Sequence, residues 1–105
     1  MVLEVAPLQI RSGREAEFEV AFATAKAILA CMPGYRSHAL RRCVERPGEY
    51  LLTVHWDSLE AHEKAFRGSL RYGEWKTLLH HFYDPIPTVS HFVEIEGLGS
   101  GGTVD

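Results

Sequence analysis

The sequence lacks an apolar run of the roughly 20 residues that a membrane-spanning helix needs. It has only two cysteines, Cys31 and Cys43, which argues against a disulfide scaffold and favours free thiols in a reducing compartment. No basic start precedes an apolar leader, so we expect a cytoplasmic protein. Positive charge is not in excess either. The formal net charge of −3 gives no electrostatic basis for binding nucleic acid or an anionic membrane.

Several familiar catalytic motifs are missing as well. The chain has no glycine-rich phosphate loop, no serine nucleophile elbow and no paired-carboxylate motif. No two histidines have metal-motif spacing on one element, so we expect no metal site. Neither cysteine lies in a setting that activates a thiol, and both are expected to be inert.

What is present is the pattern of one α+β domain over residues 1–96. Strands are predicted over residues 2–10, 35–44, 50–56 and 88–96, and helices over residues 12–32, 57–67 and 70–82. Ser12 with Glu15, and Asp57 with Glu60, have the spacing of capping boxes at helix starts. Residues 97–105 are rich in glycine and are predicted to form a disordered tail.

The order β-α-β-β-α-β is that of a ferredoxin-like fold with a four-stranded antiparallel sheet. In this fold two helices cover one face of the sheet. The strand over residues 50–56 has large apolar side chains on one face and Leu51, Thr53 and His55 on the other. An outer face that is not clearly polar predicts a homodimer that pairs two sheet faces and leaves a pocket between each sheet and its helices.

Particular residue runs resemble the antibiotic biosynthesis monooxygenase family of dimeric α+β barrels. They are Tyr50-Leu-Leu-Thr-Val-His-Trp56, Asp57-Ser-Leu-Glu-Ala-His62 and Phe66-Arg-Gly-Ser69, with Gly13-Arg-Glu-Ala-Glu-Phe18, Pro33-Gly-Tyr35 and His91-Phe92 elsewhere. The likeness extends over residues 2–96. It implies oxidation of a small aromatic or quinol-like molecule without a metal or a flavin, because a deprotonated quinol can reduce oxygen itself.

The haem-degrading members of that family use an asparagine in the first strand, a tryptophan and a histidine ligand. This chain has no asparagine, and the other two positions fall near Phe66 and Lys76. Haem degradation is therefore not expected, and no cofactor is predicted.

The candidate site residues are histidines and aromatics. His62 and Phe66 are four residues apart on one helix and face the same way, with His62 as candidate proton acceptor. His55 and His91 lie on strands and are further catalytic candidates. The predicted substrate-binding side chains are Trp56, Phe66, Tyr72, Trp75 and Phe92.

Two other functions remain open from the residues alone. The same pocket would serve a non-catalytic dimeric protein that binds a small hydrophobic molecule. It would equally serve a histidine-dependent isomerase or lyase.

Overall fold

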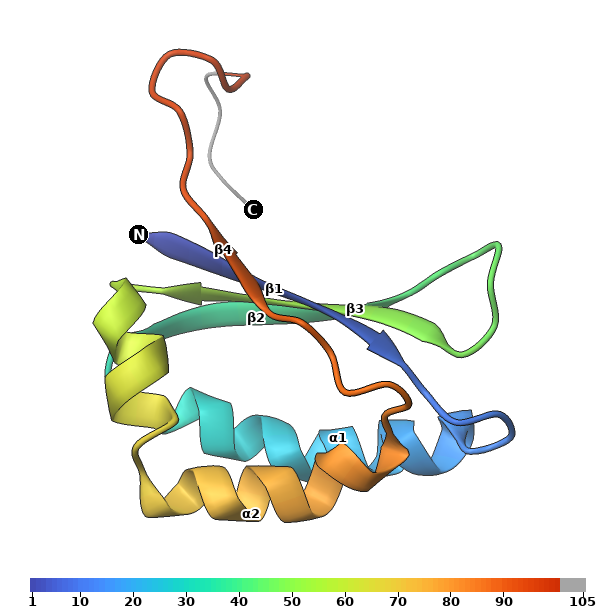
Figure 1. The fold of residues 1–105 in the computed structure, drawn as a ribbon. Coiled ribbons are helices and arrows are strands. Elements are labelled where there is room, and N and C mark those ends of the chain that lie inside the picture. Colours follow the sequence, from blue (N-terminus) through green and yellow to red (C-terminus); the bar gives the residue numbers. More distant parts are fainter. Residues whose placement is uncertain (101–105) are drawn as a thin grey trace.

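The computed structural model describes residues 1–100. The elements, in chain order, are β1 (Val2–Gln9), α1 (Glu15–Ala30), β2 (Tyr35–Arg42), β3 (Glu49–Trp56), the π-helix η1 (Ala61–Phe66), α2 (Leu70–Leu79), the 3₁₀ turn η2 (His80–Phe82) and β4 (Ser90–Phe92). Figure 1 shows the sheet as one layer and the two α-helices as a second layer beneath it.

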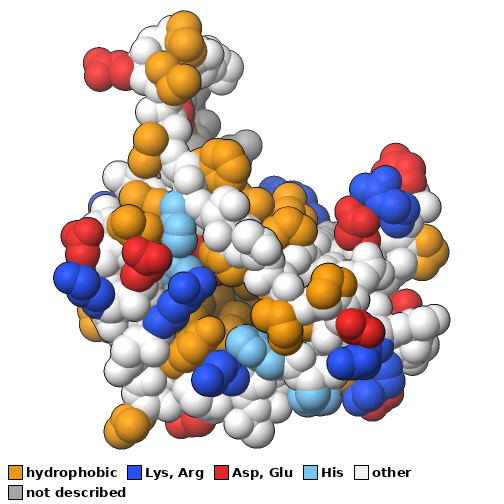
Figure 2. All heavy atoms as spheres, in the orientation of Figure 1, with side chains coloured by type: hydrophobic (Ala, Val, Ile, Leu, Met, Phe, Trp, Pro, Cys, Tyr) orange, Lys and Arg blue, Asp and Glu red, His pale blue; other side chains and the backbone are white. Residues whose placement is uncertain are grey.

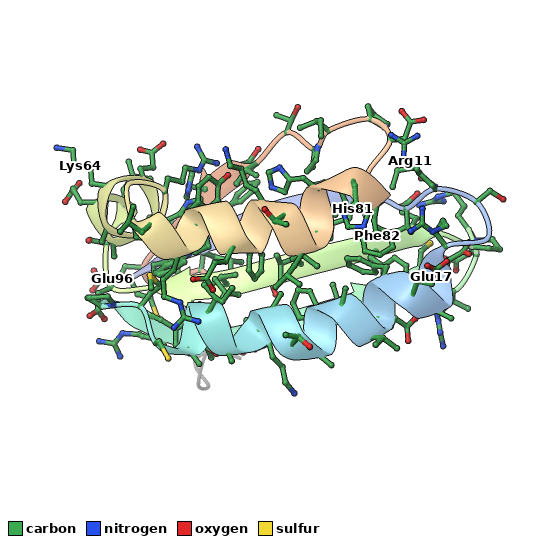
Figure 3. All side chains as sticks on the ribbon, turned by 90° about the horizontal axis from the view of Figure 1, so that it is seen from below. Arg11, Glu17, Lys64, His81, Phe82 and Glu96 are labelled. Carbon is green, nitrogen blue, oxygen red and sulfur yellow. The ribbon has the colours of Figure 1, made fainter. Side chains whose placement is uncertain are left out.

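The sheet has the strand order β2-β3-β1-β4, and each pair of neighbours is antiparallel. Helices α1 and α2 lie side by side across one face, as the view from below shows (Figure 3). This is the predicted ferredoxin-like α+β fold with a four-stranded antiparallel sheet, and the structure confirms it.

The hydrophobic core lies between the sheet and the helices. Because successive side chains of a strand alternate between faces, every second residue of β1 and β3 points toward the helices. The buried residues of β3 are Tyr50, Leu52, Val54 and Trp56, and those of β1 are Glu4, Ala6 and Leu8. Helix α1 meets them with Phe18, Phe22, Ala25, Ile28 and Leu29, which follow helical spacing.

The opposite face of the sheet is not covered by any helix of the described chain (Figure 1). Register places Leu3 beside both His55 and Phe92, and Val5 beside Thr53. Leu51 lies on the same face. The outer face is therefore a mixture of apolar and polar side chains, and it includes the charged Arg41, which pairs with Leu51.

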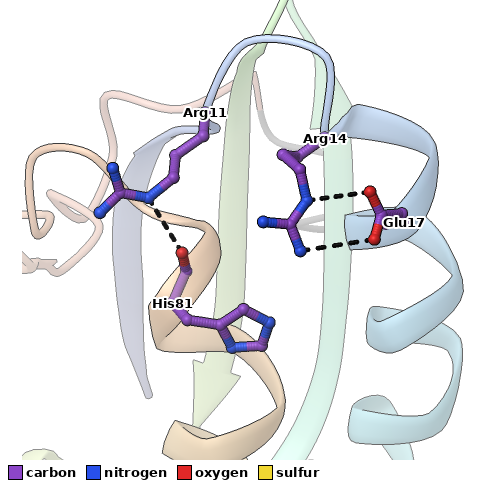
Figure 4. A network of polar contacts seen from close by, with 4 residues as sticks. All are labelled: Arg11, Arg14, Glu17 and His81. Atoms are coloured by element: carbon purple, nitrogen blue, oxygen red, sulfur yellow. Dashed lines mark hydrogen bonds and ion pairs between the residues drawn. The ribbon is translucent and has the colours of Figure 1, made fainter.

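The predicted capping box of the first helix is wrong. Arg14 occupies the N-cap position, and no side chain caps the helix. The Arg14 guanidinium instead pairs with Glu17, with 2.9 Å between Nε and Oε1, while Arg11 donates a hydrogen bond to the backbone carbonyl of His81 (Figure 4). These contacts fix the turn between β1 and α1, so a serine hydroxyl is not needed there.

The second predicted capping box is also wrong. Ser58 Oγ, rather than the Asp57 carboxylate, accepts a hydrogen bond from the backbone N–H of Ala61, at 3.2 Å. Asp57 is engaged by the guanidinium of Arg36 on β2. The helix that follows is wound as a π-helix, in which the N–H of Arg67 reaches back five residues to the carbonyl of His62.

Helix α2 and η2 together span the range predicted for one helix, and Ser69 caps its start by accepting from the N–H of Tyr72. The last strand is shorter than predicted, since β4 covers only Ser90–Phe92 rather than residues 88–96. Phe92 pairs with Leu3, one residue from the start of β1, so little partner strand remains beyond it. Residues 93–100 project away from the sheet (Figure 1).

The predicted disordered tail falls partly within the described residues, where the backbone N–H of Leu98 bonds to the carbonyl of Ile95. Residues 101–105 lie outside the description. No helix within residues 1–100 is long and apolar enough to cross a membrane.

Candidate functional site

A small cavity of about 110 Å³ lies between the inner face of the sheet and helix α2. Figure 2 shows this side of the molecule hollowed, with hydrophobic and histidine side chains around the hollow. Aromatic and aliphatic groups form most of the wall, and a carboxylate and imidazoles supply the polar part. The lining residues are Glu4, Ala6, Leu8, Leu52, His62, Phe66, Tyr72, Trp75, His80, Tyr83, Ile86, Pro87 and Val89.

Four polar side chains form a continuous chain of contacts at one end of this cavity. Trp56 Nε1 donates a hydrogen bond to Glu4 Oε1 at 2.9 Å, and the same oxygen lies 3.4 Å from His62 Nε2. On its other side, His62 Nδ1 lies 2.7 Å from Nε2 of His91. The arrangement links strands β3, β1 and β4 through the π-helix.

Strand register explains why these residues meet. Glu4 is an inward position of β1, and β4 pairs with β1 so that His91 lies directly beside it. Trp56 is inward on β3, diagonal to Glu4. The π-helix then lays His62 and Phe66 over the Trp56 indole, with ring centroids 5.4 and 5.8 Å away.

Burial perturbs both ionisable groups in the middle of the chain. Glu4 is only 6% exposed, and burial raises the pKa of its carboxyl, against the lowering effects of the Trp56 hydrogen bond and the charge of Arg67. His62 is 2% exposed, and burial, followed by the charges of Arg67 and His91, lowers its pKa to about 4. At neutral pH, His62 is therefore uncharged, and its contact with Glu4 is not an ion pair.

The neutral imidazole of His62 has one N–H, and its neighbours decide which nitrogen holds it. When Glu4 is ionised, a lone pair on Nε2 would face a carboxylate oxygen, so the proton belongs on Nε2. Nδ1 then accepts a hydrogen bond from Nε2 of His91. The two neighbours thus select one tautomer of His62.

The structure brings together most of the residues predicted for the site. His62, Phe66, Tyr72 and Trp75 line the cavity, and His91 is hydrogen-bonded to His62. Trp56 is fully buried and lies behind His62 and Phe66, without lining the cavity.

The other two predicted site residues, His55 and Phe92, lie on the opposite face of the sheet. With Met1, Leu3, Val93 and Glu94 they line an open hollow of about 580 Å³. His55 and His91 are on different faces, so they do not share a cavity. Within residues 1–100, no group of three or more histidine, cysteine or acidic side chains is arranged to hold a metal ion.

Three lining residues with ionisable side chains were not anticipated from the sequence: Glu4, His80 and Tyr83. Glu4 carried a usable signal, because it is a single charged residue at an inward position of an otherwise apolar strand. His80 packs against Tyr72 and Tyr83, with ring centroids at 6.2 and 5.4 Å. Burial raises the pKa of Tyr83 and lowers that of His80, so both are uncharged at neutral pH.

Comparison with known proteins agrees with this architecture. The uncharacterised protein YczJ of Bacillus subtilis (strain 168) is 52% identical over 95 residues, which are 90% of this chain and all of YczJ. A Bordetella bronchiseptica protein assigned to the antibiotic biosynthesis monooxygenases is 32% identical, with a TM-score of 0.86 over 90% of this chain and 96% of that one.

A third relative is an oxygenase. SnoaB of Streptomyces nogalater, a cofactor-independent oxygenase, is 26% identical, with a TM-score of 0.73 over 92% of this chain and 95% of its own. The model of the antibiotic biosynthesis monooxygenase family matches residues 1–78. The chain belongs to the antibiotic biosynthesis monooxygenase family.

Proposed function

We propose that this protein is a cofactor-independent monooxygenase that oxidises a small phenol or quinol in the cavity between the sheet and α2. The observation that carries the proposal is the pairing of Glu4 with His62 at the wall of a cavity lined mostly by aromatic and aliphatic side chains. Family membership and the likeness to SnoaB, an oxygenase that needs no cofactor, support the reaction class.

The chemistry needs a proton acceptor and a dry aromatic site. Loss of the hydroxyl proton makes the ring a phenolate, which is electron-rich enough to pass an electron to oxygen. The superoxide formed recombines at a ring carbon that bears hydrogen, and the hydroperoxide collapses to a carbonyl and water. The sum is phenol plus O₂ giving quinone plus water, so no external reductant is required.

The size of the cavity limits the substrate. An engineered apolar cavity of roughly 150 Å³ holds one benzene molecule. At about 110 Å³ the present cavity is smaller than that, so it admits at most one ring, and a fused polycyclic substrate would require the segment over Ile86 and Pro87 to move. Single-ring phenols and hydroquinones with a free ring position are therefore the proposed substrates.

Oxygen consumption tests the proposal directly. Purified protein is given a panel of single-ring hydroquinones and electron-rich phenols in an oxygen electrode, with Phe66→Ala as a variant that disrupts the aromatic wall. Oxygen uptake above the uncatalysed rate for the wild type, reduced in the variant, is expected. If the wild type binds these phenols in a thermal-shift assay but consumes no oxygen with any of them, the protein is a binding module rather than an enzyme.

The same proposal includes a homodimer formed through the outer face of the sheet. Leu3, Val5 and Leu51 on that face have no covering helix, and the segment after β4 exposes Val93 and Ile95. A second copy of the chain would bury these groups. A cytoplasmic location agrees with Cys31 and Cys43, which are free thiols.

A further inference from the structure

We propose that Glu4, rather than a histidine, takes the proton from the substrate, and that His62 and His91 are positioning residues that hold Glu4 ready to do so. The inference rests on the proposed function and deepens it. The sequence had suggested His62 for this role.

The two oxygens of the Glu4 carboxylate have different surroundings. Oε1 accepts the Trp56 indole N–H and faces His62 Nε2. Oε2 has no hydrogen-bond partner among the described residues. In that part of the chain, every side-chain nitrogen or oxygen that is sealed from solvent does have such a partner. Oε2 is therefore reachable, and the space that Glu4 lines is the cavity.

His62 cannot act as the proton acceptor in place of Glu4 without losing its hydrogen bond to His91. Its Nε2 faces Oε1 of Glu4, and its Nδ1 is bonded to His91 at 2.7 Å. In the tautomer with its proton on Nε2, His62 has its one ring lone pair on Nδ1, and His91 occupies that lone pair, so the imidazole has none free for a substrate proton. Glu4, which lines the cavity, keeps one oxygen, Oε2, without a hydrogen-bond partner among the described residues.

His91 completes the arrangement from strand β4. Its Nε2 donates to Nδ1 of His62, which keeps the His62 proton on Nε2 and directed at Glu4 Oε1. Trp56 and His62 together hold Oε1, so the orientation of the carboxyl plane is fixed and Oε2 is aimed at the substrate. This is how a residue two contacts away sets the direction of a base.

Each proton of the reaction can be followed through Oε2. The phenol O–H bond breaks, its proton binds Oε2, and the electron pair stays on the phenolate oxygen. After oxygen joins the ring carbon, Glu4 returns that proton to the terminal peroxide oxygen. The ionised Glu4 then removes the ring C–H proton, the O–O bond breaks, and the departing hydroxide takes the proton from Glu4 to form water.

Turnover of the variants tests these roles. Glu4→Gln keeps the size and the acceptor for Trp56 but cannot take a proton, so oxygen uptake at pH 7 is expected to fall by a factor of about 100 or more. The deficit should shrink at least tenfold toward pH 9.5, where a phenol with a pKa of about 10 begins to ionise in solution. The charged and titratable groups that face Glu4 are His62, Arg67, His91 and Tyr83.

The positioning residues should behave differently. His62→Gln and His91→Gln leave Glu4 in place, so a loss of about tenfold is expected, with a shifted pH profile and an unchanged KM. Glu74→Gln, an equal change of charge on the exposed side of α2, is the matched control and should behave like the wild type. A Glu4→Gln variant that turns over within threefold of the wild type at pH 7 would overturn the proposal.

A measurement without oxygen chemistry separates this inference from the proposed function. The probe is 4-nitrophenol, a single-ring phenol too electron-poor to reduce oxygen, whose ionised form absorbs visible light. Bound below its pKa, it should show partly ionised absorption in the wild type and not in Glu4→Gln, with similar Kd values. Identical spectra for the two proteins would contradict the role of Glu4. The expected spectra without oxygen uptake on any phenol would contradict only the monooxygenase.

Discussion

Glu4 and His62 are buried side by side, and burial moves their pKa values in opposite directions. For His62 the value in the folded protein is about 4, against 6.5 for an exposed histidine. As pH falls from 6.5 to about 4, His62 is protonated in the unfolded chain but not in the folded protein. The free energy of unfolding therefore falls, by at most about 1.4 kcal/mol per pH unit. Glu4 has a raised pKa in the fold, so its contribution is complete below 4.5 and is lost as pH rises through the folded value.

Above pH 4.5, in the range where His62 loses stability on acidification, the two groups therefore oppose one another, and single variants should reveal the contribution of each. Glu4→Gln removes the group whose raised pKa stabilises the folded protein at acid pH. The free energy of unfolding should therefore fall more steeply on acidification than in the wild type. His62→Gln should flatten or reverse the slope. Urea denaturation at four pH values between 4.5 and 7.5 measures this. Other histidines contribute equally to all three proteins, so parallel curves would contradict the shifts.

How far the site could be predicted depended on which residues carried a pattern. His62, Phe66, Tyr72 and Trp75 were predictable as a lining because one helical turn places residues four or three apart on one face. Glu4 was marked only as a lone acid that alternation places on the same strand face as Ala6 and Leu8, and its role needs the pairing with β3 and β4, which reveals the neighbours that it shares. His55 and Phe92 could not be assigned to a face before the register was known.

At the scale of elements, the π-helix depends on a glycine at its end. A Cβ on Gly68 would lie 2.4 Å from the carbonyl oxygen of Lys64, which is backbone and cannot turn away. Gly68→Ala should therefore destabilise the protein by roughly 2 kcal/mol or more and displace His62. Gly73→Ala, inside α2 with nothing within 4 Å, should instead stabilise by up to about 1 kcal/mol. Thermal unfolding of both variants measures these changes in stability. Equal changes for the two variants would show that a side chain is tolerated at the end of η1.

The segment between η2 and β4 lies over the cavity and sets its size. Ile86 lines the cavity although its side chain is largely exposed, so it forms part of the rim. Ile86→Ala should widen the opening at little cost in stability and let two-ring phenols such as 1-naphthol bind at least tenfold more tightly, while phenol itself changes little. Quenching of tryptophan fluorescence gives both Kd values. An unchanged preference would show that Ile86 does not limit ligand size.

The order and type of the elements were predictable, since alternation and helical spacing are properties of the sequence. The details at element ends were not. Ser12 and Asp57 had the right spacing for caps, but Arg14 with Glu17 and Arg36 with Asp57 made contacts that local rules do not anticipate. The last strand was overestimated because strand length depends on a partner, and β1 begins close to the residue that Phe92 meets.

For the molecule as a whole, the sheet face that no helix of the described chain covers is the feature that predicts a partner. Leu51 is 38% exposed on that face, near the hairpin end of β3, whereas Val20 is 72% exposed on the far side of α1. Leu51→Asp should convert a dimer to a monomer at micromolar concentration, because each copy would have to bury a carboxylate in the interface. Val20→Asp should leave assembly unchanged. Sedimentation velocity measures the oligomeric state of both variants. A wild type that is monomeric at the same concentration would contradict the proposed dimer.

The central strand β1 has side chains on both faces of the sheet, some toward the cavity and some toward the outer face. Glu4 points into the cavity, while its chain neighbours Leu3 and Val5 point to the outer face. A pleated strand cannot shift at one residue without displacing the two beside it. Whatever fills the cavity is therefore separated from whatever covers the sheet by the thickness of one backbone. If occupancy of the one side favours the other, thermodynamic linkage requires the effect to be returned in equal measure.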